Sequence, residues 1–162
     1  MKKIIIYYGY GNHTRMISEK LKKALECDVL EIQPKISYST DYQTVVDETE
    51  DNKISKKTPE IKDININLDE YDTVILGTPV WWYTITPPIR TFLTKYDLSD
   101  KTVIPFATNA GWLGSTFEEI KELCKGKVIN EMSIKFTTDH SEDKLVTSEK
   151  EINNWINKIK EI

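Results

Sequence analysis

Short apolar runs alternate along this chain with amphipathic segments of helical length, and this alternation most constrains the fold. The apolar runs have strand length and occupy about residues 3–8, 28–32, 72–78, 101–107 and 128–136. Strands that alternate with helices form βαβ units around a parallel sheet. The sequence therefore predicts one α/β domain over residues 1–162, a length sufficient to bury a complete core.

The composition of each run predicts its place in the sheet. Those at 3–8, 72–78 and 101–107 are apolar almost throughout, as in central strands covered on both faces. The last run alternates, which is typical of an edge strand. Its residues predicted to share one face are Val128, Asn130, Met132, Ile134 and Phe136. Pro105 conflicts with a central strand, because proline lacks a ladder donor and usually marks a bulge or an edge.

Helix starts are indicated by local sequence patterns. Ser115 with Glu118, and Ser148 with Glu151, match the capping box that precedes an amphipathic helix. A third helix is predicted to begin at Pro87. Two more are predicted at about residues 14–26 and near Tyr42, Val45 and Val46.

The charge balance argues against several partner classes. Net charge is −4, and residues of both signs are interspersed, whereas nucleic-acid binding favours a basic stripe. The short apolar runs do not suggest a membrane protein. The N-terminal Met1-Lys2-Lys3 lacks the long apolar region of a signal peptide, so we expect no membrane association and a cytoplasmic location.

The isolated thiols and imidazoles do not indicate catalysis or metal binding. Cys27 and Cys124 each end an amphipathic segment, where a thiol normally acts as a small buried hydrophobe. His13 is read as a donor beside an anion and His140 as a surface residue. No metal spacing occurs, so no metal and no catalytic side chain are assigned. The charged stretch 47–57 is predicted to be a surface excursion.

Three strand ends carry unusual sequence, and topology brings them to one sheet edge. In an open parallel sheet, ligands bind outside the carboxyl ends of the strands. The first loop is Gly9-Tyr10-Gly11-Asn12-His13-Thr14, the second contains Pro79-Val80-Trp81-Trp82-Tyr83, and the third is Thr108-Asn109-Ala110-Gly111-Trp112-Leu113-Gly114. These residues, apart from Leu113, form the predicted binding site.

The first loop suits a phosphate. Its glycines let backbone amides close around an anion, and a helix N-terminus follows. It matches neither the Walker A pattern nor GxGxxG, and a turn without ligand is the alternative interpretation. The second and third loops add Trp81, Trp82, Tyr83 and Trp112, which is more aromatic surface than a loop carries unless it packs or stacks. A flat conjugated molecule with a phosphate tail, such as FMN or a nucleotide, fits this combination.

These residues resemble the flavodoxin-like superfamily, in particular a bacterial branch with a proline-tryptophan-tryptophan loop. The most specific match is Gly77 to Trp82 followed by Pro87 to Leu93, and the resemblance covers essentially the whole chain. It implies a three-layer sandwich around a five-stranded parallel sheet of order 2-1-3-4-5. It also implies FMN bound without a covalent bond, with its phosphate on the first loop and its ring held by the two later loops.

The first loop departs from the family pattern Ser-x-Thr-Gly-Asn-Thr, and two alignments are open. Thr14 can take the final threonine position, or Gly11-Asn12 can match Gly-Asn, which puts Tyr8 and Tyr10 at the hydroxyl positions. Under both alignments, phosphate binding relies on backbone amides and Thr14. Tyr83 stands where the branch often has glycine.

Two redox functions and one other are compatible with the sequence. The first is an electron carrier that docks redox partner proteins, and the second is a nicotinamide-dependent FMN reductase acting on a small electron acceptor such as a quinone or nitro compound. The third is an interaction module without redox chemistry. The carrier is favoured, because no nicotinamide determinant or catalytic acid is identified. We expect a monomer or weak homodimer.

Overall fold

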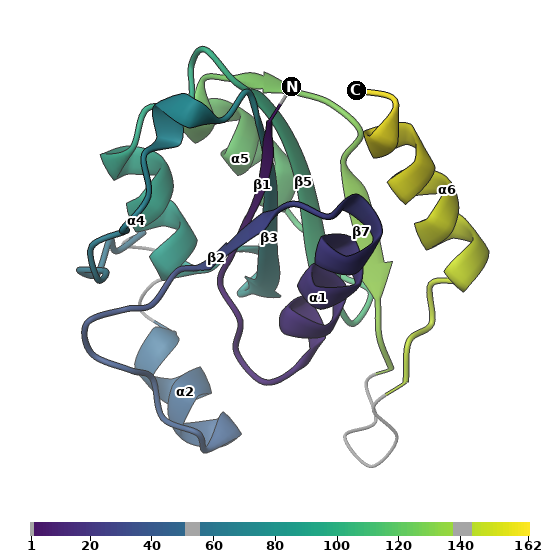
Figure 1. The fold of residues 1–162 in the computed structure, drawn as a ribbon. Helices are drawn as coiled ribbons and strands as arrows, with labels where there is room; N and C mark the ends of the chain where they lie inside the picture. The colour runs from purple at the N-terminus through teal and green to yellow at the C-terminus, as the bar shows by residue number, and fades with distance from the viewer. Residues whose placement is uncertain (1, 51–55, 138–143) are drawn as a thin grey trace.

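Helices cover both faces of a mostly parallel sheet in the computed structural model, which describes residues 2–50, 56–137 and 144–162 (Figure 1). The strands are β1 (Lys3–Tyr7), β2 (Asp28–Glu31), β3 (Thr73–Trp81), β4 (Thr84–Ile85), β5 (Thr102–Asn109), β6 (Lys127–Val128) and β7 (Met132–Lys135). The helices are α1 (His13–Leu25), α2 (Tyr42–Thr49), α4 (Pro87–Lys95), α5 (Thr116–Cys124) and α6 (Glu149–Lys160), with a 3-10 turn, η1, at Leu68–Glu70. The predicted α/β class is confirmed.

Strict alternation along the central strands divides the core between the two faces. In β1, Ile4 and Ile6 point toward the cluster under α4 and α5, whereas Ile5 and Tyr7 point toward the cluster under α1 and α6. Figure 1 shows α1 and α6 together on one side of the sheet and α4 and α5 on the other. The sheet is thus the middle of three layers.

The sheet has seven strands instead of five, so its order is not exactly the predicted 2-1-3-4-5. Pairing follows the path β2-β1-β3-β5-β6, with β7 also on β5 and β4 antiparallel to β3. Two features account for the difference. The two-residue strand β4 is too short to show periodicity, and the predicted fifth strand is divided into β6 and β7.

A bulge at Asn130 causes that division. Val128 pairs with Val103 and Met132 with Phe106, so four steps on the edge segment match three steps on β5. The extra residue lies near Asn130, whose φ is +52°. Beyond the bulge, side chains that would have pointed to one face of the sheet point to the other face. Val128 packs with the α4–α5 cluster, whereas Met132 packs with the α1–α6 cluster, so the prediction that they share a face was wrong.

The bulge also explains Pro105. The carbonyls of Val103 and Asn109 accept hydrogen bonds from Ile129 and Phe136 of the edge segment, at 3.0 and 2.8 Å. The backbone groups of alternate residues along a strand point to the same side, so the backbone nitrogen of Pro105 also faces the edge segment. It does so where the pairing register skips between β6 and β7. The missing N–H therefore falls at an interruption of the ladder, and the bulge lies on the neighbouring edge segment rather than on the strand that contains Pro105.

The serine of one of the two predicted capping boxes caps its helix. The Ser148 hydroxyl accepts from the Glu151 amide at 3.1 Å, as predicted. Ser115 is the N-cap of α5, but its side chain does not cap the helix. Its hydroxyl lies 3.5 Å from the Tyr83 carbonyl oxygen instead, so this capping box was wrong.

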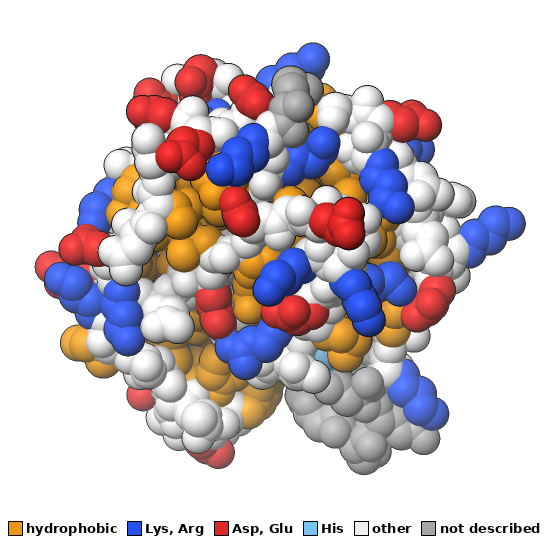
Figure 2. All heavy atoms as spheres, viewed as in Figure 1, with side chains coloured by type: hydrophobic (Ala, Val, Ile, Leu, Met, Phe, Trp, Pro, Cys, Tyr) orange, Lys and Arg blue, Asp and Glu red, His pale blue; other side chains and the backbone are white. Residues whose placement is uncertain are grey.

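The charged surface follows the pattern expected from the sequence. On the face drawn in Figure 2, basic and acidic side chains intermingle over the helices and loops. Within the part of the chain that the structure describes, no helix combines the length and apolar character needed to cross a membrane. His140 and residues 51–55 of the predicted excursion lie outside the described residues.

The two cysteines are packed as hydrophobes. Cys124 is buried in the α4–α5 cluster and Cys27 packs, half-buried, against the other. Burial raises the pKa of both thiols, which disfavours the reactive thiolate. Because the resemblance implies FMN, we expect the double variant Cys27→Ser and Cys124→Ser to keep any flavin that the chain binds and to lose some stability. Absorbance and thermal melting of the purified variant measure both, and a loss of flavin reduction with normal flavin content would reveal a thiol function.

Candidate functional site

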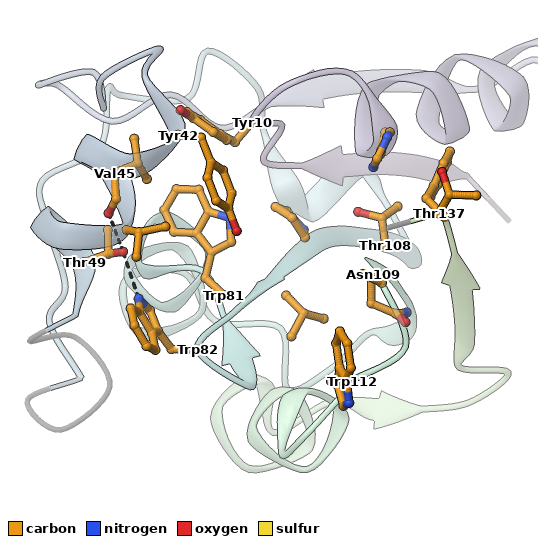
Figure 3. Close-up of a pocket in the computed structure, with 16 residues that line it drawn as sticks. Tyr10, Tyr42, Val45, Thr49, Trp81, Trp82, Thr108, Asn109, Trp112 and Thr137 are labelled. Atoms are coloured by element: carbon orange, nitrogen blue, oxygen red, sulfur yellow. Dashed lines mark hydrogen bonds between the residues drawn. The ribbon is translucent and has the colours of Figure 1, made fainter. Parts of the chain in front are cut away.

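A cavity of about 580 Å³ lies at the carboxyl edge of the sheet, in the range typical of small-molecule sites (Figure 3). The predicted residues that line it are Tyr10, His13, Pro79, Val80, Trp81, Trp82, Thr108, Asn109, Ala110 and Trp112. All three loops therefore contribute to one cavity, as the topology predicted. The residues lie at the ends of β1, β3 and β5.

Other predicted residues lie outside the lining. These are Gly9, Gly11, Asn12, Thr14, Tyr83, Gly111 and Gly114. The lining also includes residues that were not predicted: Tyr42, Val45, Val46 and Thr49 of α2, together with Phe136 and Thr137 after β7. The apolar spacing near Tyr42 predicted the helix but not the use of its inner face. Phe136 directly follows β7, so it also lies at the carboxyl end of a parallel strand, where ligands bind. The sequence prediction included only the ends of three earlier strands.

The first loop delivers a helix N-terminus to the cavity. His13 is the first residue of α1 and stacks on Phe136, with ring centroids 3.8 Å apart. The first turn of α1 contains no acidic side chain, and the Asn12 side chain does not cap the helix. The amides of the first helical turn have no partner within the helix. This end of the cavity therefore favours an anion.

The hydroxyl of Thr14 has a partner within the protein. Its hydroxyl is buried and lies 2.7 Å from the hydroxyl of Thr108. This contact joins the first loop to the end of β5. Tyr10, the other possible hydroxyl donor, donates to the Ser39 carbonyl at 2.6 Å. Both hydroxyl groups thus hold the loops in place, which leaves anion binding to the backbone amides and to His13.

Trp81 forms the centre of an aromatic cluster. Its ring contacts the edges of Tyr8, Tyr10 and Tyr38, with centroid separations of 5.8, 5.4 and 5.2 Å. These near-perpendicular arrangements are favourable for aromatic pairs. In Figure 3, Trp81, Tyr10 and Tyr42 lie together on one side of the cavity. Trp81 is therefore both a cavity wall and a part of the core.

The second loop is a tight hairpin turn made of aromatic residues. Trp81 pairs with Thr84, so the turn consists of Trp82 and Tyr83, with φ of +52° and +63°. Positive φ at both positions is the geometry of a type I′ turn, which usually requires glycine or asparagine. Glycine would adopt this backbone without strain, whereas Trp82 and Tyr83 do not. Such strain persists only where neighbouring structure fixes it.

Neighbouring groups fix this turn on both sides. The Trp82 indole N–H donates to the Thr49 hydroxyl of α2 at 3.0 Å (Figure 3). The Ser115 amide donates to the Tyr83 carbonyl at 2.9 Å. Gly114, at φ +54°, approaches so closely that an added Cβ would collide with that carbonyl oxygen. The second loop is thus attached to α2 and to the third loop.

The third loop presents Trp112 at the opposite side of the cavity from Trp81 (Figure 3). Trp112 is 63% exposed, in contrast to the partly buried Trp81 and Trp82. Asn109 shapes this loop, because its amide nitrogen donates to Ser133 Oγ at 2.9 Å and its oxygen accepts from the Gly111 amide at 2.8 Å. The two sides leave space for a flat ring between aromatic surfaces.

The cavity is lined mainly by uncharged groups. Among the described lining residues there is no Asp, Glu, Lys or Arg, and His13 is the only group that can become a cation. No group of three metal-binding side chains occurs in the described parts of the chain. The site therefore suits a cofactor that supplies its own chemistry better than a reaction that needs a charged acid-base pair.

Sequence comparison places the chain among known proteins. A family model described as Flavodoxin matches residues 2–159, nearly the whole chain. The chain belongs to the flavodoxin family. No curated protein matches it significantly. The predicted superfamily is confirmed, and the narrower branch with a proline-tryptophan-tryptophan loop stays a prediction.

Solved structures agree with this family. A flavoprotein of Lactobacillus acidophilus in complex with FMN is 25% identical over 82% of this chain and 91% of its own, with a TM-score of 0.71. A flavoprotein of Bacteroides eggerthii is 27% identical over 98% of this chain and 97% of its own, with a TM-score of 0.74. A flavodoxin from an archaeon, at 16% identity and a TM-score of 0.56 over 99% and 97% of the two chains, shares the fold.

Proposed function

We propose that this flavodoxin-family protein binds FMN in the cavity at the carboxyl edge and transfers electrons through it. The observation that carries this proposal is the meeting of a helix N-terminus with two facing aromatic surfaces around one uncharged cavity. Support also comes from the family and from the L. acidophilus flavoprotein, which was solved with FMN. When bound, FMN supplies the electron-accepting chemistry.

The described residues fit the two ends of this cofactor. The first-turn amides of α1, with His13 beside them, would hold the phosphate. Trp81 and Trp112 would enclose the ring, while the Trp82-Tyr83 turn would lie along its edge. Thr14 and Thr108 would act indirectly, because their mutual contact positions the first and third loops. The protein thereby orients the ring and excludes water from one side of it.

Electron transfer between partners is the function that the site supports best. Trp112 and Tyr83 are 63% and 55% exposed, so the rim of the cavity is accessible to a docking protein. The uncharged lining provides no carboxyl or ammonium group to accompany proton transfer to a substrate. A nicotinamide-dependent reductase of quinones or nitro compounds is the alternative enzyme, and an interaction module is the non-redox alternative.

The visible spectrum of the purified protein tests FMN binding first. A flavin spectrum is expected after reconstitution, followed by slow or no bleaching with NADH or NADPH under anaerobic conditions. Bleaching should need a separate reductase protein. Rapid bleaching by a nicotinamide alone would establish the reductase alternative, and a protein that takes up no flavin would leave the interaction module.

The phosphate assignment predicts discrimination between flavins. The apoprotein should bind FMN more tightly than riboflavin, because only FMN places a dianion at the α1 N-terminus. Fluorescence titration of the apoprotein with each flavin measures the ratio. The preference for FMN should decrease as salt increases. Equal affinities for the two flavins would show that the first loop does not bind the phosphate.

A further inference from the structure

Helix α2 lies outside the two helical layers of the fold. Figure 1 shows it beyond the carboxyl edge of the sheet, apart from the other helices. Those helices pack against strands or against one another, whereas α2 makes no comparable contact with any described strand or helix. Its inner face instead forms part of the wall of the proposed flavin cavity, through Tyr42, Val45, Val46 and Thr49. A molecule in that cavity would therefore contact α2 directly.

The sequence of α2 is unfavourable for a helix without neighbours. Half of its eight residues are β-branched, and such residues have low helix propensity. These are Thr44, Val45, Val46 and Thr49. Asp47 and Glu48 lie in the last turn and Glu50 is the C-cap, with no basic residue in that turn, so negative charges lie at the negative end of the helix dipole. Isolated helices shorter than about 12 residues are at best marginal in water, so α2 needs other contacts to persist.

One contact within the segment supports α2. Asp41 is its N-cap, and the Asp41 carboxylate accepts from the Thr44 hydroxyl at 2.6 Å and from the Thr44 amide at 3.0 Å. These hydrogen bonds hold the pKa of the Asp41 carboxyl below its usual value. Asp41 is not among the residues that line the flavin cavity. It therefore stabilises the helix without forming part of the cavity wall.

A hydrogen bond joins α2 to the aromatic hairpin. Trp82 Nε1 donates to Thr49 Oγ1 at 3.0 Å, and the Thr49 hydroxyl donates in turn to the Val45 carbonyl at 2.7 Å. Figure 3 shows Val45 and Thr49 on the same side of the cavity as Trp81 and Trp82. The hairpin turn that provides this contact has its own unfavourable backbone, with φ of +52° at Trp82. A helix of low propensity is thus attached to a strained turn.

We propose that α2 is a lid over the flavin cavity, which opens readily in the apoprotein and is held closed by bound FMN. The structure shows the closed form. In the open form, α2 leaves Trp82 and loses its helical hydrogen bonds. FMN adds contacts with the inner face of α2, and closure excludes water from that side of the cavity. This inference rests on the proposed function, because FMN is the ligand that closes the lid.

Hydrogen exchange of the α2 amides tests the lid, first in the apoprotein and then with saturating FMN. Without FMN, the amides of residues 46–49 should exchange within about tenfold of the rate of an unfolded chain, because opening costs little. FMN should slow these amides at least about tenfold, because it binds the closed form. The amides of η1, at the opposite edge of the sheet, should keep their rate. Amides of α2 as protected in the apoprotein as those of α4 would overturn the proposal.

The variant Asp41→Ala separates the lid from direct contacts with the cofactor. It removes the N-cap without changing the cavity lining, so it should weaken FMN binding at least about threefold and speed exchange of the α2 amides in the apoprotein. Charge alone predicts the reverse, because removal of a carboxylate favours the binding of a phosphate dianion.

The matched control is Ser148→Ala, which removes the N-cap of α6, a helix that does not line the cavity. This variant should leave FMN affinity unchanged. Asp41→Ala that binds FMN as tightly as the unmodified chain, or more tightly, would overturn the lid. A chain that takes up no flavin would overturn the proposed function and the lid together. Normal flavin uptake with unchanged exchange of the α2 amides would overturn the lid alone.

Discussion

Replacing Arg90 with methionine should lower the unfolding free energy of the apoprotein by about 3–5 kcal/mol, because it would leave the Glu119 carboxylate buried without its cation. Arg90 Nε donates to Glu119 Oε1 at 2.8 Å, and the exposed fractions of the two residues are only 3% and 8%. The other oxygen of Glu119 accepts from the Thr84 hydroxyl. Urea unfolding of the apoprotein measures the loss.

A control on α5, the helix that carries Glu119, separates this effect from a general effect of charge removal. Lys121 of α5 pairs with Glu131 at 2.9 Å, but both side chains are largely exposed, so Lys121→Met should change stability little. Replacing both members of the buried pair, by Arg90→Met with Glu119→Leu, should recover much of the loss. Equal destabilisation by Arg90→Met and Lys121→Met would contradict the role assigned to the buried pair.

The buried pair also shows where sequence patterns stop being informative. Arg90 and Glu119 each occupy a helix whose period is visible in the sequence, and a charged residue in such a helix normally lies on the solvent side. Tertiary packing of α5 against α4 and β4 buries both instead. The pairing depends on two segments far apart in the chain, so no local pattern indicates it.

Periodicity predicted the elements of this fold well, and the errors arose at single residues. The α1 and α2 helices lie close to their predicted positions, as do the central strands. The bulge at Asn130 shifted the alternation of the edge strand, although Pro105 indicated an irregularity on its partner strand. Ser115 was misread because its hydroxyl is directed to Tyr83, a contact that depends on the hairpin turn.

The predicted site was incomplete for a similar reason. The rule that ligands bind at the carboxyl ends of parallel strands identified all three loops. It could not show which loop residues face inward. Thr14 lies outside the cavity lining, with its hydroxyl on Thr108, and Tyr83 belongs to a hairpin turn whose Trp82 donates a hydrogen bond to Thr49 of α2. These outcomes follow from the backbone path of each loop, which the residue types leave undetermined.

The aromatic residues should separate into a ring-binding class and a packing class. Trp112→Ala should weaken FMN binding at least about tenfold, or about 1.4 kcal/mol, through loss of stacking and of ring burial. Its effect on the apoprotein should be small, because Trp112 is 63% exposed. Trp81→Ala should destabilise the apoprotein by up to about 3 kcal/mol, because it removes the centre of the tyrosine cluster.

Trp82→Ala completes the comparison. The indole of Trp82 donates to Thr49, so the variant should lower apoprotein stability as Trp81→Ala does. Its effect on FMN affinity should be smaller than that of Trp112→Ala. Thermal melting of each apoprotein and fluorescence titration with FMN give the two quantities for every variant. Stacking by Trp112 requires weaker FMN binding, less quenching of flavin fluorescence and an almost unchanged melting temperature in the same variant. If Trp112→Ala binds FMN as tightly as the unmodified chain, the flavin ring does not lie against the third loop.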